Sequence, residues 1–417
     1  MTQNPILIED ALSIILEHAQ DRKIESVSLL ESLDCVLAED MSCDINLPPF
    51  NSSAMDGFAC RKEDLVQASK ENPVALSIVG HIGAGQTFDG DVLPGQCIRI
   101  MTGCAVPDAF DSVEMIENVT WEKDGLVGDT AYFTQAIGKT NINPRGQEAL
   151  AGSLVMRAGE VIDAAGIGLL ASAGHGQVRV YARPRVGIIS TGSELSPVDA
   201  IPAPGKIRDS NSYSLAAAAK AAGAEIQLFP SSKDDKDSLQ KVILEACDLC
   251  DIVVSSGGVS VGDFDLIPNI VDTLGEMHFS RVNMKPGKSQ VFARINEASF
   301  FGLAGNPTAA SIGFERLVRP LIRSLRGFTE LARPVVTAKL SCELSKRGNR
   351  KTFLRGVIEV GKDSQLSVTP AQNQSSSLIG TLHRSNCLIM MPEGKVTKNA
   401  GDTVDCLRLD IEEGTAL

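Results

Sequence analysis

The chain of 417 residues carries 52 acidic and 39 basic side chains, and its formal net charge is −13. This acidic balance argues against a general nucleic-acid surface, and it means that an anionic ligand must be held by local donors. The length suggests two to four domains of about 100 to 200 residues each, and a hydrophobic content of 43% argues against a disordered chain.

The cysteines and the amino terminus indicate a reducing cytoplasm. Apart from Cys247 and Cys250, the ten cysteines show no paired spacing, and the first residues contain no basic region followed by an apolar run. Cys247 and Cys250 lie at the end of a predicted helix with no second pair to complete a zinc site, so helix packing is the favoured interpretation. No apolar run approaches the roughly 20 residues that span a bilayer, so we expect no membrane contact.

The first fifty residues predict two helices and a domain border. Apolar residues recur at helical spacing over residues 8–19, which predicts an amphipathic helix with one buried face. A second helical pattern covers residues 29–38. The adjacent prolines Pro48 and Pro49 then force extended backbone, and a domain border is expected near Asn46.

A small β-rich unit is predicted over residues 46–146. Its short alternating runs, at residues 75–79, 97–101 and 112–117, are typical of strands. After it, a helical stretch ends at Gly174, a residue type that tolerates the left-handed C-terminal cap. Because non-β segments flank it on both sides, the β-rich unit is expected to be an insertion.

From residue 184 the pattern changes to alternating strands and helices. Strands are predicted at 186–189, 226–229, 252–254 and 299–303, and helices at 211–222, 238–250 and 308–325. Such alternation implies a parallel sheet, whose ligands bind outside the carboxyl ends of the strands. Polar clusters follow these ends at residues 190–194, 231–235, 257–265 and 303–307. We expect these loops to converge on one edge of the sheet.

The loop after residues 252–254 has the composition of a phosphate and metal site. Gly257 and Gly258 can adopt positive φ and lie close against a bound group. Asp263 and Asp265, at alternate positions of an extended chain, can face the same ligand, and a hard cation with phosphate oxygens fits that set. An ordinary strand-to-helix loop with Asp263 as helix N-cap is the alternative.

Two neighbouring segments predict an anion site. Asn306 can cap a helix that has Pro307 at its first position, and a helix N-terminus attracts anions. Just before it, one loop carries three basic residues, Arg281, Lys285 and Lys288. Basic side chains beside acidic loops in an acidic chain favour function over solvated surface.

The last ninety residues predict a C-terminal β-barrel or sandwich. Strand-like segments separated by Gly, Asn and Ser turns lie at residues 334–340, 352–359, 366–369, 387–391 and 404–409. No internal repeat or low-complexity tract is evident.

Six motifs follow one another along the chain: PPFNSSAMDGFA, RIMTG, STGSEL, SSGGVSVGDFD, MKPGK and GLAGNP. In this order and spacing they resemble the molybdopterin molybdenumtransferase family, which includes MoeA and the E domain of gephyrin. The resemblance runs nearly end to end. STGSEL and SSGGVSVGDFD are also similar to motifs of the molybdopterin adenylyltransferases, but MDGFA and the C-terminal domain distinguish the longer family.

The resemblance implies a multidomain α/β and β fold and an elongated homodimer. It assigns residues 1–26 and 184–330 to a MogA-like α/β domain that binds molybdopterin, and residues 46–146 to an inserted β-rich domain. Residues 27–45 and 147–183 would form a connecting domain. Residues 331–417 would form a C-terminal β-barrel domain.

The implied reaction inserts molybdate into adenylylated molybdopterin, releases AMP and requires Mg²⁺. The implied partners are these two substrates, a second copy of the chain, a molybdopterin adenylyltransferase and proteins that mature molybdoenzymes. An adenylyltransferase-like enzyme is one alternative, but it does not account for residues 46–146. A non-catalytic scaffold of the gephyrin type is another, but it need not retain the site residues.

The functional positions of the family fall in the loops described above. The implied catalytic residues are Asp56, Thr102, Glu194, Asp234, Asp265 and Lys285, of which Glu194, Asp234 and Asp265 would also hold Mg²⁺. The implied substrate-binding residues are Ser190, Thr191, Gly192, Gly257, Gly258, Ser260, Arg281, Lys288, Gly305, Asn306, Arg355 and Ser376. The chain departs from the family pattern at Arg281, Ser193, Ala304 and Gln147. Arg281 stands where the family usually has lysine. Its planar guanidinium offers a fork of donors that could bind an oxyanion through two hydrogen bonds.

Overall fold

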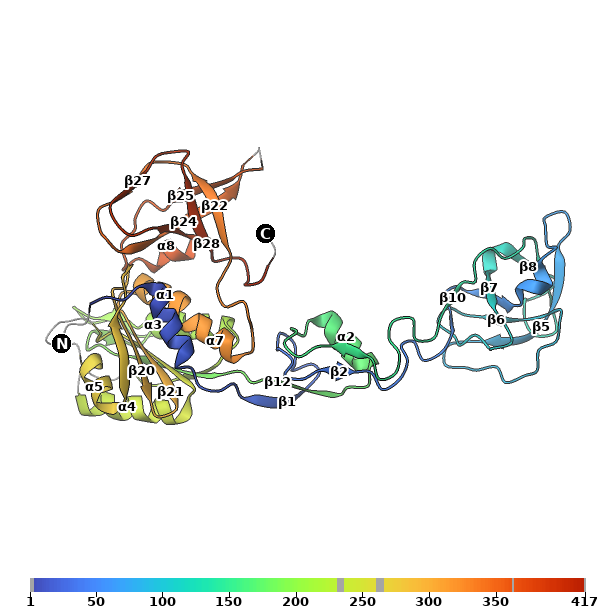
Figure 1. Cartoon of the computed structure of the whole chain (residues 1–417), viewed down its shortest axis with the longest axis horizontal. Helices are drawn as coiled ribbons and strands as arrows, with labels where there is room; N and C mark the ends of the chain where they lie inside the picture. Colours follow the sequence, from blue (N-terminus) through green and yellow to red (C-terminus); the bar gives the residue numbers. More distant parts are fainter. Residues whose placement is uncertain (1–3, 231–235, 260–265, 362–363, 416–417) are drawn as a thin grey trace. The chain divides into compact units, whose positions relative to one another are not determined.

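The computed structural model of the chain divides into two compact units (Figure 1). It describes residues 4–230, 236–259, 266–361 and 364–415. Unit 1 comprises Met1–Glu25 and Tyr181–Leu417, and unit 2 comprises Ser26–Val180. In the described residues, no helix is both long and apolar enough to cross a membrane.

The α/β part of unit 1 is built on a mixed sheet that has six strands within the described residues. In spatial order they are β16 (Glu225–Leu228), β13 (Arg185–Ser190), β17 (Ile252–Ser256), β21 (Ala298–Leu303), β20 (Ser289–Ile295) and β18 (Glu276–Arg281). The first four run parallel, as predicted. The expectation of a wholly parallel sheet is wrong at β20, which pairs antiparallel with both β21 and β18, because a two-residue turn at Asn296 and Glu297 reverses the chain between β20 and β21.

Alternate residues of the central strands face opposite sides of this sheet, as β geometry requires. Ile188 and Val254 belong to one core cluster, whereas Val253 belongs to the other. The first cluster packs with α1 (Ile8–Glu17), α3 (Asn211–Ala221) and a continuous helical segment made of α6 (Pro307–Gly313), the π-helical turn η3 (Phe314–Val318) and α7 (Arg319–Leu325). The second packs with α4 (Lys236–Leu249) and α5 (Ile267–Leu274). The amphipathic helix predicted at residues 8–19 is confirmed as α1.

The C-terminal part of unit 1 is a closed barrel. Its strands are β22 (Val335–Leu340), β24 (Lys351–Val360), β25 (Leu366–Pro370), β26 (Cys387–Met391) and β28 (Thr403–Arg408). They pair in the order β24, β25, β22, β28 and β26, and β26 pairs back onto β24, so the ring has no free edge. Short elements complete it: β19 (Met284–Lys285) on β24, the pair β23 (Leu344–Lys346) and β27 (Val396–Lys398), and α8 (Ile379–His383).

Unit 2 contains the predicted β-rich segment. Within the described residues its main sheet has the strand order β7 (Ser112–Met115), β4 (Gly57–Cys60), β6 (Gln96–Ile100), β5 (Val74–Ile82), β9 (Thr130–Phe133) and β8 (Val119–Trp121). Phe58 and Phe133 are fully buried in its core. The strands predicted at residues 75–79, 97–101 and 112–117 are confirmed. Smaller elements are η1 (Lys62–Leu65), η2 (Ile116–Asn118), β3 (Ser52–Ser53) and β10 (Ile142–Asn143). The four domain boundaries stay a prediction.

The remainder of unit 2 holds one confirmed and one wrong prediction. Helix α2 (Ala164–Ser172) is capped by the Asp163 carboxylate, which accepts a hydrogen bond from the Gly166 N–H at 2.7 Å, and Gly174 follows at φ 94° as expected. The predicted helix at residues 29–38 is wrong. Val36 and Leu37 instead form bridges with distant segments, which local periodicity cannot reveal. The paired strands here are β1 (Ile24–Ser28) with β12 (Gln177–Tyr181), and β2 (Met41–Ser42) with β11 (Leu154–Met156).

Candidate functional site

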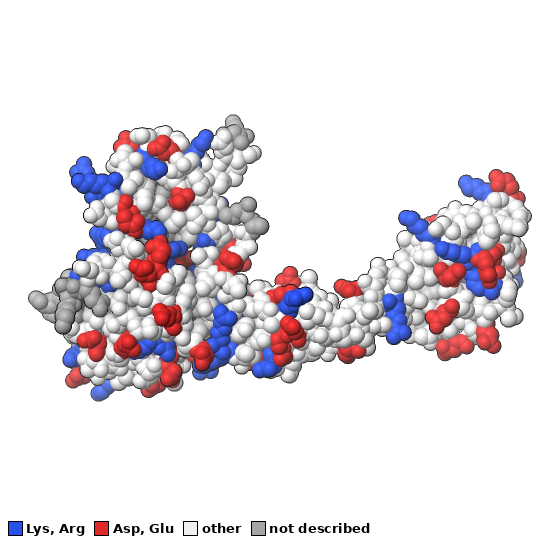
Figure 2. All heavy atoms as spheres, viewed as in Figure 1, with Lys and Arg blue, Asp and Glu red and all other residues white. Residues whose placement is uncertain are grey.

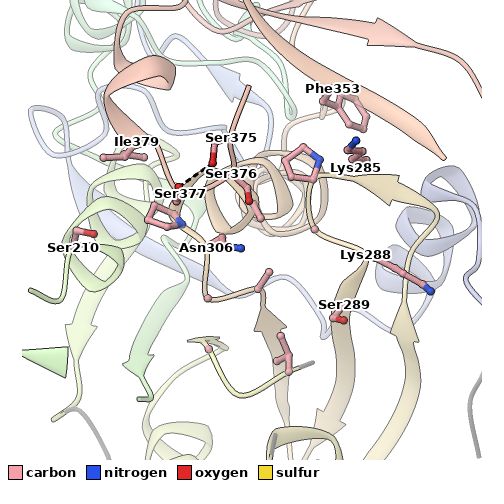
Figure 3. A pocket seen from close by; sticks show the side chains of 18 of the residues that line it. Ser210, Lys285, Lys288, Ser289, Asn306, Phe353, Ser375, Ser376, Ser377 and Ile379 are labelled. Atoms are coloured by element: carbon pink, nitrogen blue, oxygen red, sulfur yellow. Dashed lines mark hydrogen bonds between the residues drawn. The ribbon is translucent and has the colours of Figure 1, made fainter. Parts of the chain in front are cut away.

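Loops at the carboxyl ends of β13, β17 and β21 line a cavity of about 1190 Å³ in unit 1 (Figure 3). We call it the main cavity. Strand β24 and residues 374–377 of the barrel supply further wall. The predicted site residues that line it are Thr191, Gly192, Glu194, Gly257, Gly258, Lys285, Lys288, Gly305, Asn306, Arg355 and Ser376. The predicted convergence of loops is therefore confirmed for the described parts of three of them.

Four of the predicted positions fall outside the part of the chain that the structure describes. Asp234, Ser260, Asp263 and Asp265 lie outside the described residues. Elsewhere in the described chain, no group of three or more His, Cys, Asp or Glu side chains could hold a metal ion. Glu194 is the one carboxylate among the described residues that line the main cavity.

Glycines allow the three loops to lie against one another. Gly257 has φ 99°, and a Cβ atom there would lie 2.5 Å from the Thr191 carbonyl oxygen. Gly305 lies in turn against Gly257, because a Cβ on Gly305 would be 3.5 Å from the Gly257 Cα. In the first loop, a Cβ on Gly192 would lie 2.5 Å from a carboxylate oxygen of Glu194. The conformation of Glu194 therefore depends on a glycine at position 192.

Asn211, at the start of α3, ties two of these loops together. Its side-chain N–H groups donate to the Ser256 Oγ at 2.7 Å and to the Gly305 carbonyl oxygen at 2.8 Å. Sequence reasoning treated Asn211 only as the beginning of a helix. An Asn at a helix start that follows a site loop is the signal that could have found it.

Ser190 forms a hydrogen-bonded cluster beneath the main cavity. Its hydroxyl hydrogen is shared between the Asp209 Oδ1, at 3.1 Å, and the oxygen of the Ser212 hydroxyl, which lies very close. Asp209 also accepts from the Ser212 N–H at 3.0 Å and from the Ser212 Oγ at 2.6 Å. Ser190 is buried and does not line the main cavity, so it supports the loop that carries Thr191.

Basic side chains outnumber acidic ones around the main cavity. In the described lining they are Arg208, Lys285, Lys288, Arg350 and Arg355, against the single carboxylate of Glu194. Lys285 is placed by β19, which pairs with β24 of the barrel. Arg281, at the end of β18, does not line the cavity. Of the three basic residues predicted to bind the oxyanion or phosphates, Lys285 and Lys288 line the cavity and Arg281 does not. Their joint role stays a prediction.

Arg355 is 1% exposed, and the described residues provide no carboxylate for it. Its guanidinium donates to the Asn373 carbonyl oxygen at 3.0 Å and to the Ser375 carbonyl oxygen at 3.1 Å, while its Nε has no described partner. Burial lowers the pKa of Arg355. Arg355 fixes the segment that presents Ser376 to the cavity (Figure 3).

The start of α6 differs from the predicted anion site. Pro307 is at the first helical turn as expected, but the Asn306 side chain makes no capping hydrogen bond and lines the cavity instead. The Thr308 N–H donates to the Ser376 carbonyl oxygen at 3.0 Å. One of the backbone N–H groups that a helix start leaves free therefore binds the barrel segment around Ser376 and is not available to a ligand.

In unit 2, Asp56 and Thr102 form a pair of exposed polar residues. The Thr102 N–H and Oγ1 both donate to the Asp56 Oδ1, at 2.7 and 2.8 Å. The backbone hydrogen bond, followed by the side-chain one, lowers the pKa of Asp56. The structure therefore brings these two predicted residues together within their own unit.

The interpretation of Cys247 and Cys250 as packing residues is confirmed. Both lie in the core cluster behind the sheet. Burial raises the pKa of Cys247 to about 12 and that of Cys250 to about 11, so neither thiol is a ready thiolate.

Three family models match successive parts of the chain. The MoeA N-terminal region (domain I and II) matches residues 6–174, a probable molybdopterin binding domain matches residues 187–324, and the MoeA C-terminal region (domain IV) matches residues 337–409. Together they span both units.

Curated relatives and solved structures agree with these models. A relative from Staphylococcus aureus (strain MSSA476), named molybdopterin molybdenumtransferase, is 35% identical over 97% of this chain and 96% of its own length. A relative of the same name from Bacillus subtilis (strain 168) is 35% identical over 99% and 96%. Two solved molybdopterin biosynthesis MoeA proteins from Pyrococcus horikoshii, 28% and 26% identical, give TM-scores of 0.82 and 0.78, covering 98% and 97% of this chain and 100% of theirs. The chain belongs to the MoeA family.

Proposed function

We propose that this chain is a molybdopterin molybdenumtransferase, which inserts molybdate into adenylylated molybdopterin and releases AMP to form the molybdenum cofactor. The observation that carries the proposal is the charge of the main cavity. Its described lining contains five basic side chains and one carboxylate, although the whole chain has a net charge of −13. Both substrates are anions. A local excess of cations is what an acidic protein needs in order to hold them.

The cavity also suits the chemistry of the step. Cleavage of a phosphoanhydride develops negative charge on the leaving phosphate, and fixed cations stabilise that charge. Lys285 and Lys288 carry mobile ammonium groups that can follow the phosphate oxygens. Arg355 is held rigidly by two carbonyl oxygens, so its charge is fixed in place before any substrate arrives. We assign the oxyanion to Arg355, Ser376 and Lys285.

Mg²⁺ belongs to the proposal as a cofactor. Magnesium in phosphoryl-transfer sites binds carboxylate oxygens and substrate phosphates and keeps several waters. Glu194 supplies one such carboxylate at the cavity, and Asp234 and Asp265 are the proposed others. When bound, the ion would neutralise phosphate charge and leave the side chains of this chain to orient the substrates.

A homodimer with shared sites is the proposed assembly. Asp56 and Thr102 belong to unit 2, whereas Glu194, Lys285 and Arg355 belong to unit 1. A two-fold dimer can bring unit 2 of one chain to unit 1 of its partner, and the same contact then forms both sites.

Subunit mixing tests the shared site. Asp56→Asn is mixed with Glu194→Gln under conditions that exchange subunits, so that about half the dimers are mixed under random pairing. One site of each mixed dimer then collects both defects and the other has none, and roughly a quarter of wild-type activity should return. Heterodimers that stay inactive would assign Asp56 to its own chain.

The two alternatives receive less support. An adenylyltransferase would need only the α/β part, whereas the family models also cover residues 6–174 and 337–409. A non-catalytic scaffold would have no need of a buried Arg355 that has no counter-ion among the described residues. The homologues that cover nearly the whole chain carry an enzyme name.

The proposal is tested with a charge-removing variant and a matched control. Lys285→Met should lower molybdate-dependent AMP release by at least about tenfold, since charge-assisted hydrogen bonds contribute about 1.5–3 kcal/mol. Lys339→Met removes the same charge from an exposed position of β22 and should leave the rate unchanged. Equal rates in both variants and the wild type would contradict the assignment of the site.

A further inference from the structure

A second cavity of about 330 Å³ adjoins the main cavity and shares part of its wall. The shared residues are Lys285, Arg350, Thr352, Leu354 and Gln374. The residues that line the second cavity alone are Leu344, Ser345, Lys346, Arg347 and Gly348, from β23 and the turn that leads into β24. We call this second cavity the basic annex.

The annex concentrates positive charge. Lys285, Lys346, Arg347 and Arg350 line it, and its described lining contains no carboxylate. None of these four side chains forms an ion pair with any described residue. At the start of β24, the neighbouring Lys351 does form an ion pair, with Glu9, so unpaired cations are not a general property of this segment. Figure 2 shows Lys and Arg atoms gathered at the edge of the barrel near β27, the strand that pairs with β23.

Internal hydrogen bonds hold the annex in shape. The Lys346 Nζ donates to the Arg350 carbonyl oxygen at 2.7 Å and to the Gly348 carbonyl oxygen at 3.1 Å. The Thr352 Oγ1 donates to the same Arg350 carbonyl oxygen at 3.0 Å. An ammonium group has three N–H donors, so Lys346 keeps one donor for a ligand while it closes the turn.

The surroundings of Lys346 disfavour its charged form. Burial lowers the pKa of Lys346, Glu393 acts in the opposite direction, and the neighbouring Lys285 lowers it further. The carboxylate of Glu393 does not line the annex. The negative charge of a bound anion would offset the cost of burying this ammonium and the repulsion between the two lysines.

We propose that the basic annex is an anion subsite, separate from the main cavity, that binds the phosphate group of a small molecule or a free tetrahedral oxyanion. Lys346, Arg347 and Arg350 would hold the anion together with Lys285, which faces both cavities. The annex volume of about 330 Å³ exceeds that of a single oxyanion and lies at the low end of small-molecule pockets, about 300–1,000 Å³. The apolar side chains of Leu344 and Leu354 suit the organic part of a phosphate ester.

Equilibrium binding to the full chain tests this subsite without any turnover, so its outcome is independent of the proposed reaction. Inorganic phosphate and phenyl phosphate are titrated separately by calorimetry at low ionic strength into wild type and three variants. Arg347→Gln changes a residue that lines only the annex, and Lys288→Gln changes one that lines only the main cavity. Lys398→Gln is the control, because it removes one charge from β27 at a position that lines neither cavity.

Wild type should show two classes of site. Arg347→Gln should weaken one class by at least about tenfold, which corresponds to 1.4 kcal/mol, and leave the other unchanged. Lys288→Gln should do the reverse, and Lys398→Gln should alter neither. Tighter binding of phenyl phosphate than of inorganic phosphate to the Arg347-dependent class identifies an organic phosphate as the ligand, and equal binding identifies a free oxyanion. A single class that responds to Lys288→Gln and not to Arg347→Gln would overturn the proposal, as would equal effects of Arg347→Gln and Lys398→Gln.

Discussion

Thr102 donates two hydrogen bonds to one oxygen of Asp56, from its backbone N–H at 2.7 Å and from its Oγ1 at 2.8 Å. Both residues are exposed, so this carboxylate is oriented by its hydrogen bonds and not by burial. The two bonds hold Asp56 in one orientation and favour its ionised form.

The first prediction concerns the ionisation of Asp56. The hydrogen bonds from Thr102 lower its pKa, so they stabilise the folded chain above the ordinary Asp pKa, and this contribution is lost as the pH falls through the lowered value. Thr102→Val removes the Oγ1 donor and should raise the pKa of Asp56 towards its ordinary range, measured by NMR titration. Thr102→Ser keeps the donor and serves as control. An unchanged pKa in the valine variant would mean that the backbone bond alone sets it.

The second prediction tests the contact between the site loops. Gly257→Ala forces a side chain into positive φ and places its Cβ against the Thr191 carbonyl oxygen. We expect a loss of about 1–3 kcal/mol of unfolding free energy, measured by denaturant titration, because strained backbone costs that much. Gly305→Ala is the matched control, since its Cβ would make only ordinary contacts. Equal stability of the two variants would contradict the described loop geometry.

The third prediction concerns a buried ion pair at the end of the chain. Glu413 accepts hydrogen bonds from the Arg319 Nε at 2.6 Å and from its NH2 group at 2.9 Å, and its side chain is fully buried. Glu413 also pairs with Arg323 at 3.3 Å, and without Glu413 the buried Arg319 keeps only the longer 3.8 Å pair with Glu315. Removing one partner of a buried ion pair is strongly destabilising, so Glu413→Gln should cost about 3 kcal/mol of unfolding free energy. Glu412→Gln changes an exposed neighbour and should cost much less.

The same pair predicts a dependence of stability on pH. Burial acts to raise the pKa of Glu413, but the hydrogen bond and charge of Arg319 outweigh it and lower the pKa below its ordinary value. A lowered pKa means that the stabilisation is complete above the unfolded pKa and is lost as the pH falls through the folded one. Acid unfolding of wild type and Glu413→Gln should therefore converge at low pH. A constant difference would exclude Glu413 as the titrating group.

The fourth prediction separates Arg355 from Arg281. Arg355→Lys cannot reach both carbonyl oxygens with a planar fork, so the molybdate concentration needed for half-maximal rate should rise by about tenfold or more. Arg281→Ala should have a smaller effect, because Arg281 does not line the main cavity. A larger effect of Arg281→Ala would instead assign oxyanion binding to Arg281, as the resemblance implied.

Much of the α/β part and of the site could be predicted from local sequence. Apolar runs followed by polar loops located β13, β17 and β21, and parallel topology then required their ends to meet. The antiparallel strands β18 and β20 and the bridges of Val36 and Leu37 depend on pairing partners that local periodicity does not identify.

The missed site residues share a physical cause. Asn211 acts through contacts with two loops distant in sequence, and Arg350 borders both cavities only because the barrel closes beside the sheet. As an isolated residue, each resembles ordinary polar surface.

The central claim is that the main cavity couples molybdate insertion to release of AMP. The most direct measurement follows AMP and molybdenum cofactor together, in purified chain supplied with adenylylated molybdopterin and Mg²⁺, with and without molybdate. We predict equal amounts of AMP and cofactor with molybdate, and little AMP without it. AMP release at the same rate in the absence of molybdate, or no release in its presence, would contradict the account.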